Sequence, residues 1–182
     1  MAALKPPCRR LALASLAAAA ALLPGLAPAA SARKSSAVHH SVLQSRLLWA
    51  TIDVCSPPDQ PDTVGIRGSM PGDGHSHDAL YMSFRLQYLN GSGTSQTWSN
   101  LGAGGSSGFI SVGGGGTSRQ AGRSFTLVPV PGKHSTLRGV VTFEWRRGAT
   151  VMRSTERPTT AGHISQTGAD PKSYTAATCT IS

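Results

Sequence analysis

Hydrophobic and polar residues alternate with a period of two in several short stretches of this chain. The clearest stretch is Leu80–Leu89, where every second residue up to Tyr88 is Leu, Met, Phe, Leu or Tyr and the positions between them include Ser, Arg and Gln. Because successive side chains of a strand point to opposite faces, this pattern predicts a strand that is buried on one face. The pair Asn90-Gly91 is a strong turn signal and predicts that this strand ends there.

Seven further short runs have a similar character and are separated by Gly, Pro, Asn and Asp residues. They are Trp49–Cys55, Val64–Met70, Phe109–Val112, Ser124–Val130, Arg138–Arg146, Thr150–Thr155 and Ala177–Ile181. No stretch shows the 3.6-residue period of an amphipathic helix. About eight short strands with regular turn signals predict an all-β fold, either a single antiparallel β-sandwich or a small barrel.

The composition narrows the classes of protein to consider. The 182 residues include 17 Lys and Arg against 8 Asp and Glu, for a net charge of +9, and charged residues make up 14%. Charged residues usually make up about a quarter of a soluble domain. One modest domain is therefore expected, rather than a coiled coil or a multidomain enzyme.

The first 32 residues predict a signal peptide. A basic start precedes the apolar run Leu11–Leu23, which is too short to span a membrane comfortably. Small residues permit cleavage after Ala29 or Ala32, and we favour Ala32. The Arg9-Arg10 pair leaves both the general and the twin-arginine export routes open. The protein is expected to be secreted or associated with the cell envelope, without a membrane span.

The mature chain is expected to contain a flexible segment at 33–47 and a folded domain at 48–182. Cys8 leaves with the signal, so that Cys55 and Cys179 are the cysteines of the mature chain. In an oxidising compartment such a pair predicts a disulfide bond, with two unrelated buried thiols as the alternative.

Three segments carry a resemblance to a known kind of domain: Thr63–Gly68, Arg138–Trp145 and Tyr174–Cys179. They resemble small secreted immunoglobulin-like or fibronectin-type-III-like domains of actinobacteria, to which no function is assigned. The resemblance covers roughly Trp49 to Ser182. It implies a β-sandwich of that type, with Trp145 in the core, and it brings no catalytic residues.

The loop from Asp73 to Asp78 is the most distinctive polar cluster. It reads Asp-Gly-His-Ser-His-Asp, so that His75 and His77 fall on one side of an extended segment and the two aspartates flank them. Imidazole and carboxylate groups are ligands that Zn²⁺ and Cu²⁺ accept, so Asp73, His75, His77 and Asp78 are candidate metal ligands. The alternative is an ordinary solvated turn between two strands.

Two further features are candidates for ligand binding. One predicted hairpin is crowded with arginines: Arg138, Arg146, Arg147, Arg153 and Arg157. Of these, Arg146, Arg147 and Arg153 are the candidates for binding an anionic glycan of the cell envelope. The alternative is a pair of edge strands protected by cationic side chains. Trp98 lies among polar residues, which makes it a candidate for stacking on a sugar ring.

The sequence predicts no enzyme and no cofactor. The chain has only eight acidic residues, and no two of them form a recognisable pair of catalytic carboxylates of the glycosidase type. Residues Gly104–Gly108 match the letters G-x-S-x-G, but no helix follows them to form a nucleophile elbow. We expect a secreted binding or structural module that contacts an anionic glycan or another secreted protein, not nucleic acid. The alternatives are an exported metal-binding protein that uses the Asp73–Asp78 loop, and a small secreted hydrolase or protease inhibitor.

Overall fold

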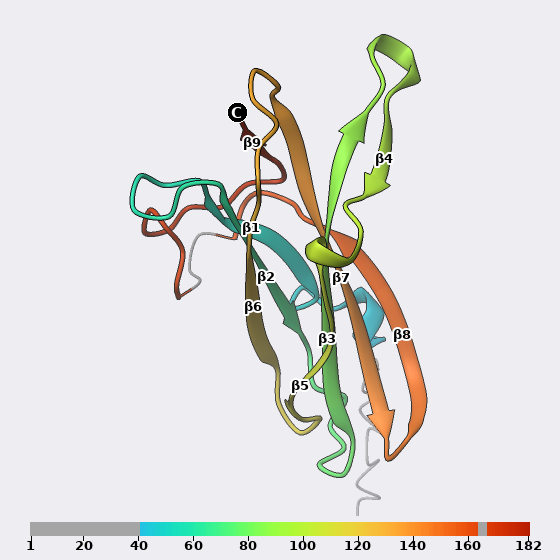
Figure 1. The fold of residues 1–182 in the computed structure, drawn as a ribbon. Coiled ribbons are helices and arrows are strands. Elements are labelled where there is room, and N and C mark those ends of the chain that lie inside the picture. Colours follow the sequence, from blue (N-terminus) through green and yellow to red (C-terminus); the bar gives the residue numbers. More distant parts are fainter. Residues whose placement is uncertain (1–40, 164–166) are drawn as a thin grey trace, which may run out of the picture. The chain divides into compact units, whose positions relative to one another are not determined.

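The computed structural model describes residues 41–163 and 167–182 (Figure 1). The predicted signal peptide, its cleavage sites and residues 33–40 of the predicted flexible segment lie outside the described residues. Residues 41–47 of that segment include a single-turn 3₁₀ helix, η1 (Val42–Gln44), which the Ser41 side chain caps by accepting a hydrogen bond from the Leu43 N–H.

Nine strands form most of the described chain. They are β1 (Trp49–Cys55), β2 (Thr63–Met70), β3 (Ala79–Asn90), β4 (Thr97–Asn100), β5 (Ser106–Gly114), β6 (Arg119–Thr126), β7 (Ser135–Arg147), β8 (Thr150–Pro158) and β9 (Cys179–Ile181). Two further single turns, η2 (Gly93–Ser95) and η3 (Ala103–Gly105), flank β4. The all-β prediction is confirmed.

Two details of the strand prediction are wrong. Strand β4 was not predicted because its four residues, Thr-Trp-Ser-Asn, show no apolar alternation, and backbone pairing with β3 places it in the sheet. Strand β6 begins at Arg119 and ends at Thr126, so the predicted run Ser124–Val130 is displaced. Because β6 buries only Phe125, its hydrophobic pattern carries little information, and prolines at 129 and 131 lack the N–H that a longer ladder needs.

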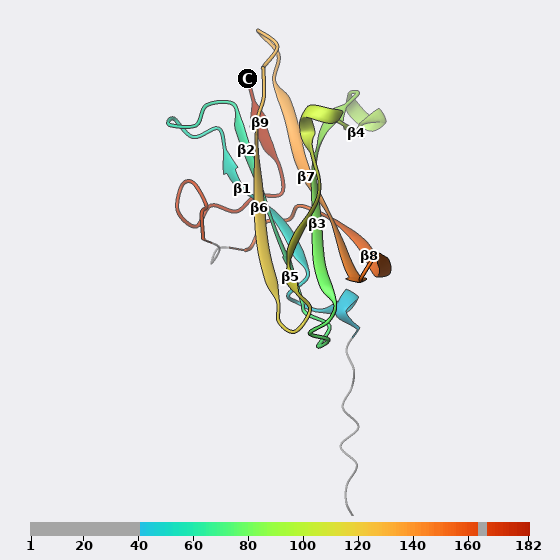
Figure 2. The ribbon, with the colours of Figure 1, turned by 60° about the horizontal axis from the view of Figure 1, so that its bottom comes forward.

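The strands form two antiparallel sheets. The smaller has the order β1-β2-β6, and the larger has the order β4-β3-β7-β8, with β5 on the same edge of β3 as β4 and with β9 paired to β7. Figures 1 and 2 show β1, β2 and β6 on one side and β3, β7 and β8 on the other.

The hydrophobic core lies between the two sheets. The even-numbered residues of β3 from Leu80 to Leu86 are fully buried, as the alternation predicts, and so are Phe143 and Trp145 of β7. The indole Nε1 of Trp145 donates a hydrogen bond to the Pro71 carbonyl at 3.0 Å, so its one polar atom is satisfied inside the core.

Two glycines allow the sheets to approach each other closely. A Cβ at Gly139 of β7 would lie 2.8 Å from the Ile66 Cδ1 of β2, and a Cβ at Gly68 of β2 would lie 3.1 Å from the Val141 Cγ1 of β7. Ile66 and Val141 are fully buried and have no free space to move into. The absence of side chains at these two positions therefore sets the spacing of the sheets.

A disulfide bond joins Cys55 at the end of β1 to Cys179 at the start of β9, as predicted. Because β1 belongs to the smaller sheet and β9 to the larger, this bond links the two sheets covalently. The chain before β9 runs along β1, where the Ala176 N–H donates to the Ile52 carbonyl at 3.0 Å and the Asp170 N–H donates to the Asp53 carbonyl at 2.9 Å.

Replacement of Gly139 by Ala tests the spacing of the sheets. The added methyl group would overlap Ile66, so we expect the free energy of unfolding to fall by about 1–3 kcal/mol, the usual cost of overpacking a core. Gly104→Ala is the matched control, because a Cβ there meets nothing within 4 Å. Urea denaturation of both variants measures the difference, and equal stability of the two would contradict this account of the interface.

Candidate functional site

The outer face of the larger sheet, which points away from the core, carries two of the predicted binding residues, Trp98 and Arg146. On β3 the even-numbered side chains fill the core, so the odd-numbered ones from Tyr81 to Leu89 point outward. Register then places Arg138 of β7 and Asn100 of β4 beside Gln87, and Trp98 beside Leu89. These residues share one face although they are far apart in sequence.

At one end of this face lies the Trp98 cluster, formed by Gln87, Trp98, Asn100 and Arg138. The guanidinium carbon of Arg138 lies 4.4 Å from the centre of the Trp98 ring. The Arg138 Nε donates to the Gln87 Oε1 at 2.8 Å, and the Gln87 Nε2 donates to the Asn100 Oδ1 at 2.9 Å. The cluster thus brings two amide groups, a guanidinium and an indole ring together on one face.

Arg138 differs from the other arginines of this face because no described carboxylate pairs with it. Burial lowers the pKa of its guanidinium, since partial removal from water disfavours the charged form. The positive charge is nevertheless kept, because arginine stays protonated in proteins. Arg138 therefore presents a partly desolvated cation without an internal counter-ion.

At the other end lies the Tyr81 cluster, formed by Tyr81, Phe109, Glu144 and Arg146. The guanidinium of Arg146 lies 4.2 Å from the Tyr81 ring centre and 4.7 Å from the Phe109 ring centre. Its Nε also donates to the Glu144 Oε2 at 2.6 Å. Phe109 is 44% exposed, so this cluster offers an accessible aromatic ring.

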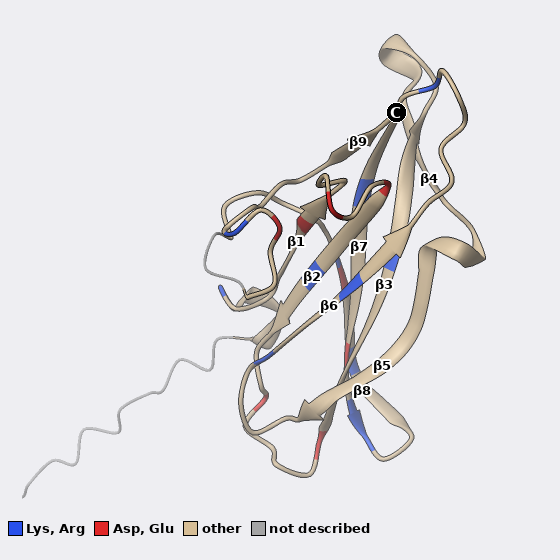
Figure 3. Cartoon of the chain, turned by 60° about the vertical axis from the view of Figure 1, so that its left-hand side comes forward, with Lys and Arg blue, Asp and Glu red and all other residues tan. Residues whose placement is uncertain are grey.

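Between the two clusters an ion pair joins β3 to β8. The Arg85 Nη2 donates to both carboxylate oxygens of Glu156 at 2.8 Å, and the Thr142 hydroxyl donates to the same carboxylate at 2.9 Å. Burial alone would raise the pKa of Glu156, but the hydrogen bonds from Arg85 and Thr142 outweigh it and the pKa is lowered. Figure 3 shows basic and acidic positions interspersed over several strands, not gathered by sign.

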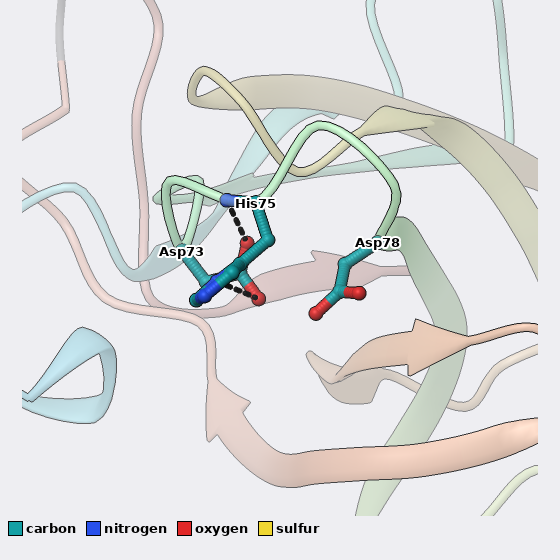
Figure 4. Close-up of side chains that lie close together, drawn as sticks. All are labelled: Asp73, His75 and Asp78. Carbon is teal, nitrogen blue, oxygen red and sulfur yellow. Dashed lines mark hydrogen bonds and ion pairs between the residues drawn. The ribbon is translucent and has the colours of Figure 1, made fainter.

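The predicted metal-binding residues lie in the loop between β2 and β3 (Figure 4). The potential ligand atoms of Asp73, His75 and Asp78 all lie within 4.8 Å of one another, whereas His77 is exposed and lies outside this group. The Arg147 Nε and Nη2 donate to the two carboxylate oxygens of Asp78 at 2.7 and 3.0 Å. This pairing lowers the pKa of Asp78.

The loop is fixed against the turn between β5 and β6. The Gly74 N–H donates to the Gly115 carbonyl at 3.1 Å, and the Gly115 N–H donates to the Asp78 carbonyl at 2.6 Å. A Cβ at Gly115 would lie 2.6 Å from the Asp73 Oδ1, so a side chain there would displace the carboxylate. Two separate turns thus determine the position of Asp73.

The three predicted arginines have different surroundings. Arg146 pairs with Glu144 and Arg147 pairs with Asp78, so both are partly neutralised within the molecule. Arg153 is exposed and lies opposite Trp145 in the register, on the other face from Arg138. Gln87 and Asn100 were not predicted from the sequence, and Arg138 was grouped with the hairpin arginines but not chosen as a binding residue. The alternation along β3 and β7 contains the signal that places Gln87 and Arg138 outward.

An apolar hollow of about 340 Å³ opens at one end of the core. It is lined by Tyr88, Leu101, Leu127, Val128, Pro129, Val130, Ser135, Leu137 and Ile181. Val128 is 94% exposed and Val130 is 57% exposed, so the segment between β6 and β7 forms an open wall of this hollow.

Comparison with models of protein families and with curated proteins finds no match. Among solved structures, the sporulation control protein Spo0M from Bacillus subtilis matches 60% of this chain and 46% of its own, at 13% identity and a TM-score of 0.30. The match thus spans less than half of that protein, and we draw nothing on fold or function from it.

Replacement of Arg85 by Gln tests the central ion pair through its pH dependence. A lowered pKa in the folded state stabilises the protein above the unfolded pKa of Glu156, and this contribution is lost as the pH falls through the folded pKa. We therefore expect Arg85→Gln to lower the melting temperature near neutral pH and to differ less from the parent protein as the pH falls below the folded-state pKa of Glu156, where this side chain is protonated in both. Arg153→Gln, which removes the same charge from an exposed position, serves as the control. A difference between Arg85→Gln and the parent that stays constant with pH would contradict this assignment.

Proposed function

We propose that this protein is a secreted, non-enzymatic binding module whose contact surface is the outer face of the six-stranded sheet. Its ligand class is an anionic glycan of the cell envelope. In this proposal the two sheets form a β-sandwich of the immunoglobulin-like or fibronectin-type-III-like type, which serves as a scaffold for the face. The fold type supports binding only by analogy, whereas the side chains of this face support it directly.

One observation carries the proposal: Arg138 stacks on Trp98 and has no described carboxylate partner. A partly desolvated guanidinium favours binding of an anion, because the ion pair formed with that anion offsets the free-energy cost of burying the guanidinium. The amide groups of Gln87 and Asn100 lie beside it and can exchange hydrogen bonds with hydroxyl groups. Charge, aromatic surface and amides together suit a polyhydroxylated anionic ligand.

The extent of the face favours an elongated ligand. Tyr81 and Gln87 stand six residues apart on β3, which corresponds to about 20 Å along an extended strand. Both ends of this stretch carry an aromatic ring with an arginine over it. Tyr, Trp and Arg are the residues that dominate binding energy at protein surfaces.

Export is part of the proposal and rests on the predicted signal peptide and on the disulfide bond. The disulfide bond between Cys55 and Cys179 is consistent with an oxidising compartment outside the cytosol. In the part of the chain that the structure describes, no helix has the length and apolar character needed to cross a membrane.

The test measures binding of the purified protein to immobilised wall teichoic acid, with uncharged dextran as the comparison. We expect Arg138→Gln and Trp98→Ala each to weaken binding to teichoic acid about tenfold or more, as loss of a central contact does. Arg153→Gln removes the same charge from the other face of the sheet and is expected to change affinity less than about twofold.

Two results would contradict the proposal. Equal weakening by Arg138→Gln and Arg153→Gln would show that the attraction depends on net charge alone. Affinity unchanged by both Trp98→Ala and Arg138→Gln would show that the outer face is not the contact surface.

A further inference from the structure

Asp73 is a buried carboxylate with one oxygen left without a hydrogen bond. Its side chain is 2% exposed. The Oδ1 accepts a hydrogen bond from the His75 backbone N–H at 3.0 Å, but no described residue donates a hydrogen bond to Oδ2. The hydrogen bond to Oδ1 is what an ordinary turn between two strands would form. The turn does not account for Oδ2, because burying a charged oxygen without a hydrogen-bond partner is unfavourable.

A second buried carboxylate lies beside it. The side chain of Asp78 is 1% exposed, and an oxygen of each aspartate falls within the same 4.8 Å group. Two carboxylates this close repel each other unless positive charge lies between or beside them. Arg147 pairs directly with Asp78 and also attracts Asp73 through space, and the His75 Nδ1 lies 3.6 Å from the Asp73 Oδ2.

We propose that Asp73 Oδ2, Asp78 and His75 Nδ1 together hold one divalent transition-metal ion. This inference is independent of the glycan-binding face. A donor set of two carboxylate oxygens and one imidazole nitrogen suits ions such as Zn²⁺ or Mn²⁺. His75 is 60% exposed at its side chain, so water completes the coordination from the solvent side.

The pairing of Asp78 with Arg147 is compatible with this site. A carboxylate has about four lone-pair positions, so Asp78 can keep a hydrogen bond from Arg147 and offer another position to the ion. Arg147 then acts as a partner outside the ligand set, which fixes the orientation of a ligand. Because Arg147 extends from the end of β7, the ion would also strengthen the link between the β2–β3 loop and that strand.

The predicted set of four residues is thereby reduced to three. His77 is exposed and lies outside the group that the loop brings together. It has the same side chain as His75 and stands two residues away in the same loop. His77 therefore provides a matched control for every measurement on His75.

The experiment titrates the untagged, metal-free protein with ZnCl₂ and, separately, with MnCl₂ by isothermal calorimetry, and follows the melting temperature in parallel. We expect one ion per chain for at least one of the two metals and a rise in melting temperature with that ion. Asp73→Asn retains an Oδ1 that accepts the His75 N–H, so the loop is kept while the charged oxygen is lost. Loss of a partner outside the ligand set weakens metal binding roughly 10–100-fold. Because Asp73→Asn removes a ligand itself, we expect it to weaken metal binding by at least this factor.

His75→Ala provides the second variant, and because this side chain is exposed the protein is expected to fold. It should weaken binding as Asp73→Asn does, whereas His77→Ala should bind like the parent protein. The absence of heat and of a melting shift with both ions at millimolar concentration would overturn the site. Binding that survives Asp73→Asn, or that is lost in His77→Ala but not in His75→Ala, would overturn it as well.

Discussion

The disulfide bond between Cys55 and Cys179 is the constraint on which much of the structure depends. It joins the first strand of the smaller sheet to the last strand of the larger one and closes a loop with a sequence separation of 124 residues. Loop entropy assigns such a bond up to about 5 kcal/mol. The bond also holds the chain before β9 against β1, where Asp53 becomes buried and its pKa is raised by loss of water, although its ion pair with Arg67 opposes the shift.

The packing of a small sheet on a larger one leaves the larger sheet with two unlike faces. Strands β3 and β7 are 12 and 13 residues long, and their inward side chains form the core with β1 and β2. Their outward side chains include aromatic rings, amides and arginines that interact across strands. The long strands thus serve both the stability of the core and the display of the proposed contact face.

The sequence was informative where burial on one face imposes a period of two. This condition holds for β3 and for most of β7, whereas β1 is buried on both faces. It fails for β4 and β6, which bury one residue between them and take their place in the sheet through backbone pairing. Pairing of the two cysteines followed from their number and from the predicted oxidising compartment. The cluster around Trp98 did not follow, because it depends on the register that sets Arg138 and Asn100 beside Gln87. The same limit applies to the proposed metal-binding loop, where spacing alone does not distinguish His75 from His77.

The central claim is that ligand contact occurs on the outer face of the six-stranded sheet. The most direct measurement is the change in backbone amide chemical shifts when wall teichoic acid is added to the isotope-labelled protein. The account predicts that the shifts concentrate at β3, β4 and the β7 residues around Arg138. Shifts confined to β1, β2 and β6, or to the loop between β2 and β3, would contradict it.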